Sequence, residues 1–495
     1  MFNRLKNVFN KIKDLNVSVD NYKQDSIIQS LPTVAYVNKA KKLIEEKQFE
    51  KAETLLKEAL DISTQDSKVY KYLGKIYERN FDTINAIENY EKSAQLNPQD
   101  KEIWLRLGMC QLNFKQFEQA IESFEKANKV TPMNTDVYTG WGMALMRLKK
   151  YALARDKFVT ASQISKYNFT AILLSAIMEI RLGDYESAET KLEFLAKVAP
   201  NESSTYEYAH LKLIKSDYKE AEKYAKKSLE INKQMLPAYF ILGEIYSLQK
   251  DYEKTNKTFQ SAIDNDLENE TLHFEWGKAC IRLFDFDCAK NHFEIALNKD
   301  SNYIDAKIGL ALVKSLEGDF TLLDKLKEKN GSNVYIQEAI GLKYFSQGKY
   351  EDALEMFKKA LRTDIKQTYN LLHIARCYQY LNNNEKIKEY FEKFIQENPQ
   401  YKTGLLEYSK WLIKIADFAD AQRKLRKVEK LDNECIEALN LLFYTSYILV
   451  KDNVCEYNVK EAISIAEKIK TLGNFEYETE KEELENILKN IQENK

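Results

Sequence analysis

Residues 67–98 read SKVYKYLGKIYERNFDTINAIENYEKSAQLNP, and this stretch decides the fold. With Ser67 as position 1, the distinctive residues fall at positions 4, 7, 8, 11, 20, 24, 27 and 32: Tyr70, Leu73, Gly74, Tyr77, Ala86, Tyr90, Ser93 and Pro98. The pattern returns one period later with Trp104, Leu107, Gly108, Ala120, Phe124, Ala127 and Pro132. A period of about 34 residues predicts a repeated pair of helices joined by a turn.

The spacing and residue set resemble the tetratricopeptide repeat. Aligned from Thr33, they give about thirteen frames, which begin at residues 33, 67, 101, 135, 169, 202, 236, 270, 304, 334, 368, 402 and 436. An aromatic at position 17, Ala at 20 and Pro at 32 recur and support this register. Gly at position 8, inside a helix, indicates that two helices cross closely there. The resemblance implies an all-α fold, a right-handed superhelical solenoid of helix–turn–helix repeats.

Composition narrows the function classes. The 495 residues hold only 14 Gly and 6 Pro, which favours helix, and the net charge is −2. Without a basic surplus, a nucleic-acid partner is not expected. The six cysteines show no paired spacing, so we expect free thiols in a reducing compartment. With no apolar run long enough to span a membrane and no secretory signal, we expect a cytoplasmic protein.

The two ends differ from the repeats. Residues 1–16 predict an amphipathic helix whose apolar face carries Phe2, Leu5, Phe9 and Ile12, with Arg and Lys residues between them. It could cap the first repeat, dock on a partner or on the chain itself, or lie on an anionic membrane. At the other end, the sequence predicts an acidic capping helix.

Interruptions in the period predict the domain organisation. We expect an amphipathic helix and linker at 1–32, a first array at 33–319, a short irregular seam at 320–333, a second array at 334–470 and the acidic cap at 471–495. Frame 436 carries about seven extra residues around 451–458, which we place between its two helices.

Catalytic signatures are missing from the sequence. It contains no phosphate-binding glycine loop, nucleophile elbow, zinc-protease motif or calcium loop, so we expect neither an enzyme nor a cofactor. One repeat holds His273, Cys280, Cys288 and His292, which could bind zinc. Two of these residues occupy core positions of the repeat, so we favour core packing and expect no metal.

In tetratricopeptide proteins, positions 2, 5, 9, 12 and 13 of each first helix usually line the concave face. Frame 67 places four cations there: Lys68, Lys71, Lys75 and Arg79. The following frames place an apolar row there: Leu105, Met109, Leu112, Met143, Met146, Leu173, Ile177, Ile180 and Tyr206. The row continues with Leu213, Ile214, Phe240, Ile308, Leu312, Leu316, Leu342 and Phe345.

A long apolar row is seldom left open to water. A helix or extended segment of a partner could fill it, with its acidic end near Lys71. Alternatively, consecutive repeats could bury the row, or residues 2–15 of the chain could occupy it.

The chaperone-binding members of the family grip a C-terminal carboxylate with a defined clamp. Here Lys71 matches that clamp, whereas Lys75, Arg106, Asp136 and Gly140 do not. We therefore expect a non-enzymatic scaffold or adaptor that holds a protein segment in its concave groove. The alternative is a peripheral membrane adaptor, anchored through residues 1–16, that recruits an assembly at the cytoplasmic face.

Overall fold

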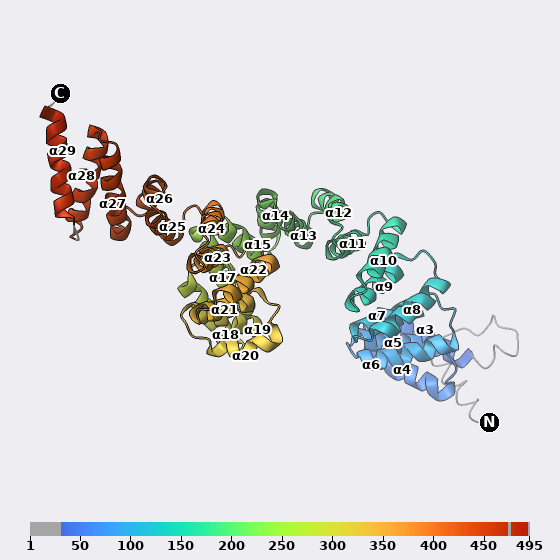
Figure 1. The fold of residues 1–495 in the computed structure, drawn as a ribbon. Helices are drawn as coiled ribbons and strands as arrows, with labels where there is room; N and C mark the ends of the chain where they lie inside the picture. The colour runs from blue at the N-terminus through green and yellow to red at the C-terminus, as the bar shows by residue number, and fades with distance from the viewer. Residues whose placement is uncertain (1–30, 474–476, 494–495) are drawn as a thin grey trace. The chain divides into compact units, whose positions relative to one another are not determined.

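The computed structural model describes residues 31–473 and 477–493, and every regular element in those ranges is an α-helix (Figure 1). The predicted amphipathic residues Phe2, Leu5, Phe9 and Ile12 lie outside the described residues. The chain divides into two compact units at residues 241 and 242, within helix α15 (Leu236–Leu248). These helices confirm the all-α class and the solenoid of stacked hairpins.

Unit 1 is a series of helix hairpins that agrees with the predicted register. Its helices are α3 (Leu31–Glu45), α4 (Phe49–Ile62), α5 (Ser67–Arg79), α6 (Thr83–Leu96), α7 (Ile103–Asn113), α8 (Phe117–Val130), α9 (Thr135–Arg147), α10 (Tyr151–Ile164), α11 (Phe169–Leu182), α12 (Tyr185–Val198), α13 (Glu202–Ile214) and α14 (Tyr218–Ile231). In each hairpin, the first helix ends at position 13 or 14 and the second begins at position 17.

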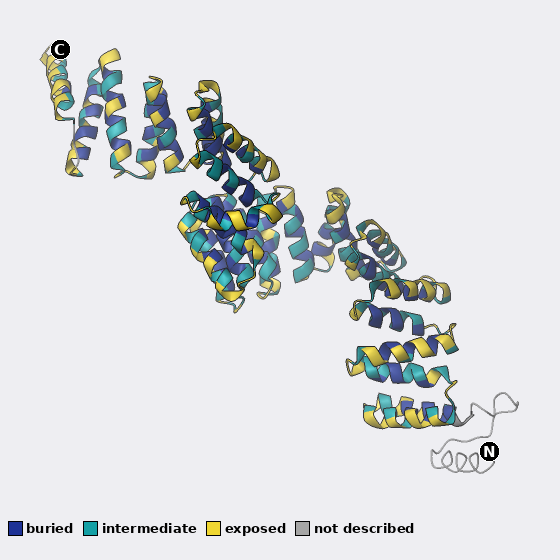
Figure 2. Ribbon diagram, turned by 60° about the horizontal axis from the view of Figure 1, so that its bottom comes forward, coloured by how far each residue is buried: buried dark blue, intermediate teal, exposed yellow. Residues whose placement is uncertain are grey.

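Unit 2 continues the same order. Its helices are α16 (Tyr252–Ile263), α17 (Glu270–Leu283), α18 (Phe286–Lys299), α19 (Ile304–Leu316), α20 (Thr321–Asn330), α21 (Val334–Ser346), α22 (Tyr350–Thr363), α23 (Tyr369–Tyr380), α24 (Asn384–Glu397), α25 (Lys402–Lys414), α26 (Phe418–Leu431), α27 (Ile436–Asp452), α28 (Glu456–Thr471) and α29 (Glu478–Glu493). Within both units the buried residues gather where helices face one another (Figure 2).

One backbone turn joins the two helices of each repeat. The residue at position 15 has a positive φ in twelve consecutive frames, from 53° at Asn382 to 88° at Gly318. Only three of these residues are glycine. The other nine, which include Lys47 and Lys115, adopt the left-handed conformation although they carry a side chain. The next residue often caps the second helix, as Asp82 does by accepting the Asn85 N–H at 3.2 Å.

The glycine at position 8 is explained by an aromatic ring at position 24. A Cβ atom on Gly142 would lie 2.6 Å from the ring of Phe158, and one on Gly74 would lie 2.6 Å from Tyr90. The other pairs of this kind are Gly108 with Phe124, Gly243 with Phe259, Gly277 with Phe293, and Gly341 with Phe357. The close helix crossing expected from the sequence is thus a glycine–ring contact.

Unit 2 closes upon itself around a shortened hairpin. Helix α20 is the shortest among the described residues and buries only Leu323 and Leu326, so α19 packs directly on α21. This packing brings together residues that are far apart in the sequence. For example, the Lys366 amine donates a hydrogen bond to the Glu244 carboxylate at 3.0 Å. The ring of Phe284 lies 5.0 Å from that of Tyr369 and 4.7 Å from that of Tyr401.

The domain boundaries stay a prediction, although three observations bear on them. Residues 320–333 hold the short helix α20 and lie inside unit 2. The extra residues of frame 436 lengthen α27 and α28, leaving only 453–455 between them. At the C-terminus, α29 buries Leu484 against unit 2 and also packs Ile487, Leu488 and Ile491 there.

The cysteine expectation was wrong in one respect. Cys280 and Cys288 form a disulfide, because α17 and α18 bring their Cα atoms to 5.9 Å, a normal separation for such a bond. The other four, Cys110, Cys377, Cys435 and Cys455, are free. Cysteine usage therefore no longer argues for a reducing compartment.

The histidines beside this disulfide lie in the core. His273 and His292 face each other with their Nδ1 atoms 3.0 Å apart, and both rings stack near Trp276. Burial and the neighbouring His273 lower the pKa of His292 to about 4, so His292 is uncharged at neutral pH. Within the described ranges, no group of three or more His, Cys, Asp or Glu side chains could hold a metal ion.

We predict that Gly142→Ala destabilises the protein. Helix propensity alone would stabilise the alanine variant by about 0.5–1 kcal/mol, but the clash with Phe158 should cost about 1–3 kcal/mol. Urea unfolding followed by circular dichroism measures the change.

The double variant Gly142→Ala/Phe158→Leu provides the control. It reproduces the Ala176 and Leu192 pair found one repeat later, so it should lose less stability than the two single changes added together. Additive losses would contradict a direct contact between positions 8 and 24.

We also predict that unit 2 gains stability between about pH 8 and 9.5. Lys250 donates to the Arg282 carbonyl and lies over the ring of Phe284. Burial, aided by the nearby Arg282, lowers the pKa of Lys250 to about 8. The unfolded state therefore holds more protons than the folded state in this interval, and stability rises with pH.

The control is Lys250→Met, which keeps an apolar chain over Phe284 but removes the titrating amine. This variant should show no such gain when unfolding is measured at pH 7.5 and 9.5. An equal gain in both proteins would show that another group is responsible.

Candidate functional site

The predicted partner-binding residues lie on the first helices of unit 1, and two of the four cations among them, Lys71 and Lys75, form ion pairs. The Lys71 amine lies 3.0 Å from Asp100 and 2.9 Å from Glu102, and the Lys75 amine lies 2.9 Å from Glu102. Arg106, which was not among the predicted partner-binding residues, bonds Glu102 at 2.5 Å and Glu78 at 3.0 Å. Lys71 is therefore not available to receive the acidic end of a partner.

This network fixes the charge of its central carboxylate. Burial alone would raise the pKa of Glu102, but hydrogen bonds from Lys71, Lys75 and Arg106 outweigh it and lower that pKa to about 2. The two other predicted cations are exposed. Of these, Arg79 places its guanidinium 4.4 Å from the ring centre of Phe49, a cation–π contact.

The part of the predicted row from Leu105 to Tyr206, which we call the apolar stripe, is neither closed nor fully open. Beyond it, Leu213 is buried and Ile214 is exposed. All nine of its members are half-buried: Leu105, Met109, Leu112, Met143, Met146, Leu173, Ile177, Ile180 and Tyr206. Their inner atoms pack on the cores of the hairpins, for example around Phe124 and Phe158. Their remaining surface faces solvent and offers an apolar contact area.

A pocket of about 420 Å³ opens within this stripe. Its walls come from α7, α8, α9 and α11 and from the turn after α7. The lining residues, which define the methionine pocket, are Leu112, Asn113, Lys115, Phe117, Met143, Met146, Arg147 and Leu174. Apolar walls with a few polar groups at the rim are typical of a site that receives a side chain of a partner.

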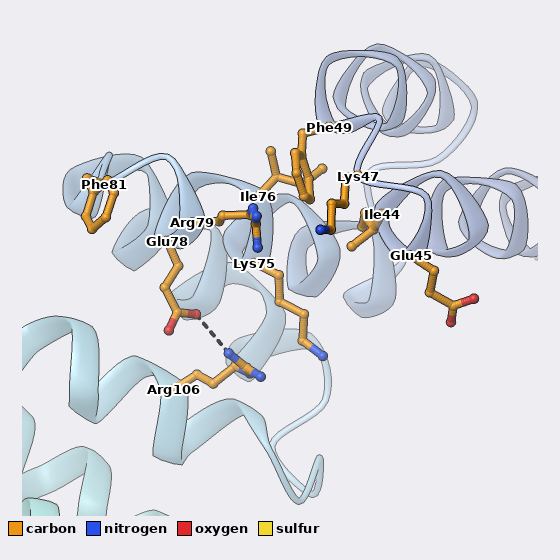
Figure 3. A pocket seen from close by; sticks show the side chains of 10 residues that line it. All are labelled: Ile44, Glu45, Lys47, Phe49, Lys75, Ile76, Glu78, Arg79, Phe81 and Arg106. Carbon is orange, nitrogen blue, oxygen red and sulfur yellow. Dashed lines mark hydrogen bonds and ion pairs between the residues drawn. The ribbon is translucent and has the colours of Figure 1, made fainter.

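A second pocket of about 800 Å³, the cationic pocket, lies nearer the N-terminus (Figure 3). It is lined by Ile44, Glu45, Lys47, Phe49, Lys75, Ile76, Glu78, Arg79, Phe81 and Arg106. Figure 3 shows Lys75, Arg79 and Arg106 on neighbouring helices around one space, with the bond between Glu78 and Arg106 across it. The two predicted residues in this pocket are Lys75 and Arg79.

The equivalent positions in unit 2 are partly closed. Ile308 and Leu312 are buried, whereas Leu316, Leu342 and Phe345 are half-buried and pack against the core of unit 2. Arg282, at a position that would face the groove, is also buried and lies 3.9 Å from Glu244. Self-burial, one of the three alternatives for the apolar row, thus describes unit 2 better than unit 1.

Several pocket residues escaped the sequence analysis. Lys47 and Lys115 lie at position 15, in the turn, and Phe117 lies at position 17, where its aromatic ring was taken only as support for the register. Leu174 lies at position 6 of its repeat. The repeat register could have indicated these residues, because equivalent positions of neighbouring repeats lie close together wherever the period is kept.

Comparison with known proteins agrees with the repeat geometry. A model of the cytochrome c-type biogenesis protein H TPR domain matches residues 93–206. Tetratricopeptide repeat models match residues 72–100, 237–266 and 369–401. The chain is a tetratricopeptide repeat protein. Proteins of this family are typically non-catalytic interaction scaffolds, and the fold supports that general role.

The chain is also similar to several named repeat proteins. Antiviral innate immune response effector IFIT1 of Macaca fascicularis is 24% identical over 215 residues, which cover 36% of this chain and 44% of that protein. TPR repeat-containing protein MJ1428 of Methanocaldococcus jannaschii is 26% identical over 235 residues, or 45% of this chain and 38% of that protein. The match thus spans less than half the length of these relatives.

Among solved structures, the APC/C hetero-tetramer Cut9–Hcn1 resembles this tetratricopeptide repeat chain in fold. The two are 12% identical, with a TM-score of 0.53 over 94% of this chain and 98% of that one. At this identity the likeness concerns the fold alone. In the ranges that the structure describes, no helix is long and apolar enough to cross a membrane.

We predict that Glu102→Gln destabilises unit 1 at neutral pH, because it removes the charge that Lys71, Lys75 and Arg106 share. The folded-state pKa of Glu102 lies below its unfolded value, so its contribution is present above about pH 4.5 and is lost as pH falls toward 2. The difference in unfolding midpoint between wild type and variant should therefore shrink across this interval. Glu122→Gln, an exposed change in the middle of α8, is the control and should have no effect at either pH. A Glu102→Gln difference that is constant with pH would contradict the network.

Proposed function

We propose that this protein is a non-enzymatic scaffold that holds a segment of a partner protein along the apolar stripe of unit 1. The observation that carries the proposal is the half-burial of all nine stripe residues around an open pocket. Apolar surface of this extent, bordered by polar residues, is typical of interaction sites. A helix or an extended segment would bury it on binding.

The chemistry of the stripe suits a protein ligand. Met109, Met143 and Met146 are unbranched and polarisable, so they can adapt to differently shaped apolar side chains. The stripe crosses successive first helices, so a bound segment would contact several repeats at once. Contact with several repeats favours an elongated protein segment, and not a small molecule, as the ligand.

The contrast with unit 2 supports placing the site in unit 1. Unit 2 buries two of its five corresponding apolar residues, Ile308 and Leu312, whereas none of the nine stripe residues of unit 1 is buried. Its contacts between Glu244 and Lys366 and around Phe284 hold that arrangement. Unit 2 therefore suits a structural role.

We predict that Met143→Glu/Met146→Glu abolishes partner capture without unfolding the protein. Both side chains are half-buried, so the carboxylates can reach water while they repel an apolar ligand. The measurement is quantitative affinity capture from the native cell, with isotope-labelled mass spectrometry and circular dichroism of each bait.

The matched control is Met133→Glu, because Met133 is 67% exposed between α8 and α9 and lines neither pocket. The control should capture the same proteins as the wild type. Equal capture by all three baits, or loss of helix in the double variant, would show that the stripe is not the binding site.

A further inference from the structure

The cationic pocket and the methionine pocket are the same site repeated. Each lining residue of the methionine pocket lies two repeats after a residue of the cationic pocket. Thus Lys115 corresponds to Lys47, Phe117 to Phe49, and Arg147 to Arg79. Three repeats build each pocket, and the repeat beginning at residue 101 contributes to both.

The two pockets share three features. Each has a lysine in the left-handed turn, with φ 61° at Lys47 and 65° at Lys115. Each has a phenylalanine at the start of the next helix and an arginine in the last turn of the following first helix. In each pocket, these shared residues are a lysine and an arginine beside an aromatic ring.

The remaining walls differ in character. Where the cationic pocket has Lys75, Glu78 and Arg106, the methionine pocket has Met143, Met146 and Leu174. The charged walls of the first are already paired through Glu78 and Glu102. The second therefore has room for an apolar side chain, and the first is a polar surface.

The lysine and the arginine that both pockets share are the cations available to contact a ligand. Lys47, Arg79, Lys115 and Arg147 are all exposed, and none forms an ion pair with another described residue. The methionine pocket has no carboxylate in its lining, and the cationic pocket has only Glu45 and Glu78. Both rims therefore carry positive charge that anionic groups would complement.

We propose that the two pockets together bind one acidic amphipathic segment of a partner protein. An apolar side chain enters the methionine pocket, and carboxylates lie on the pairs Lys47–Arg79 and Lys115–Arg147. This inference rests on the proposed function and adds the chemistry of the partner. Neighbouring helices lie about 10 Å apart, so two repeats span roughly 20 Å, the length of a helix of about 14 residues.

Segments of this same chain are poorer occupants. The acidic helix α29 is amphipathic, but it already buries Leu484 and packs Ile487, Leu488 and Ile491 on unit 2. Residues 1–16 are apolar at suitable spacing, but their sequence carries Arg4, Lys6, Lys11 and Lys13, which the cationic rims would repel.

The test is selection of a random 16-residue peptide library displayed on phage against the purified full chain. Selected peptides should be rich in Asp and Glu beside Leu, Met or Phe. The best of them, synthesised with a fluorescent label, should bind Lys47→Glu/Lys115→Glu at least about tenfold more weakly than wild type, because each attraction becomes a repulsion. Binding should also weaken when NaCl is raised.

Lys129→Glu/Lys219→Glu makes the same charge change on the exposed faces of α8 and α14 and should bind the peptide within about twofold of wild type. Apolar peptides without acidic excess, or equal binding to the two charge variants, would overturn the acidic partner while the proposed function stands. Peptides that bind Met143→Glu/Met146→Glu as well as wild type would overturn the proposed function itself.

Discussion

The contact between position 8 of the first helix and position 24 of the second sets how closely each hairpin can pack. Where position 8 is glycine, an aromatic ring fills the space, as Phe124 does against Gly108. Where position 8 is larger, the partner is usually smaller, as in the pairs Ala40 with Leu56, Ala176 with Leu192, and Ser409 with Leu425. The combined volume is thus similar in these pairs, as close packing demands, whereas Ala209 with Ala225 is smaller and Ala375 with Phe391 is larger. Because each hairpin has a similar thickness, successive hairpins can stack and bring their first helices into one row.

This regular unit gives two different results in the two parts of the chain. In unit 1 the period is nearly constant, and the row of first helices leaves part of each stripe residue exposed to solvent. In unit 2 the short helix α20 lets α19 and α21 meet, and the rings around Phe284 close the structure. The interruption of the repeat, and not the repeat itself, therefore decides which row remains available to a partner.

The sequence predicted what depends on short range and period. The register and the helix pairs follow from residues within one frame, whereas the seam at 320–333 stays a prediction. Contacts between frames were not accessible in the same way. Lys71 was taken as a free cation because Asp100 and Glu102 belong to the following connection and repeat. The bond from Lys366 to Glu244 joins residues 122 apart, which a local pattern cannot indicate.

The candidate site, too, could be predicted from the sequence only where it depends on residues of a single repeat. The stripe residues were predicted individually, because their positions in the repeat are fixed. The pockets were not, since three repeats must converge before Leu112, Met146 and Leu174 line one space. The disulfide between Cys280 and Cys288 was missed because a separation of eight residues is uninformative until two helices turn to face each other.

The central claim is that the stripe of unit 1 is open to a partner, and the methionines of the chain report on it directly. Limited oxidation of the purified protein with hydrogen peroxide, followed by peptide mass spectrometry, gives a rate for each methionine. Met133, which is 67% exposed, and Met178, which is 1% exposed, mark the two limits. Met143 and Met146 should oxidise at rates between these limits. Rates as slow as that of Met178 would mean that the stripe is closed, and would contradict the account.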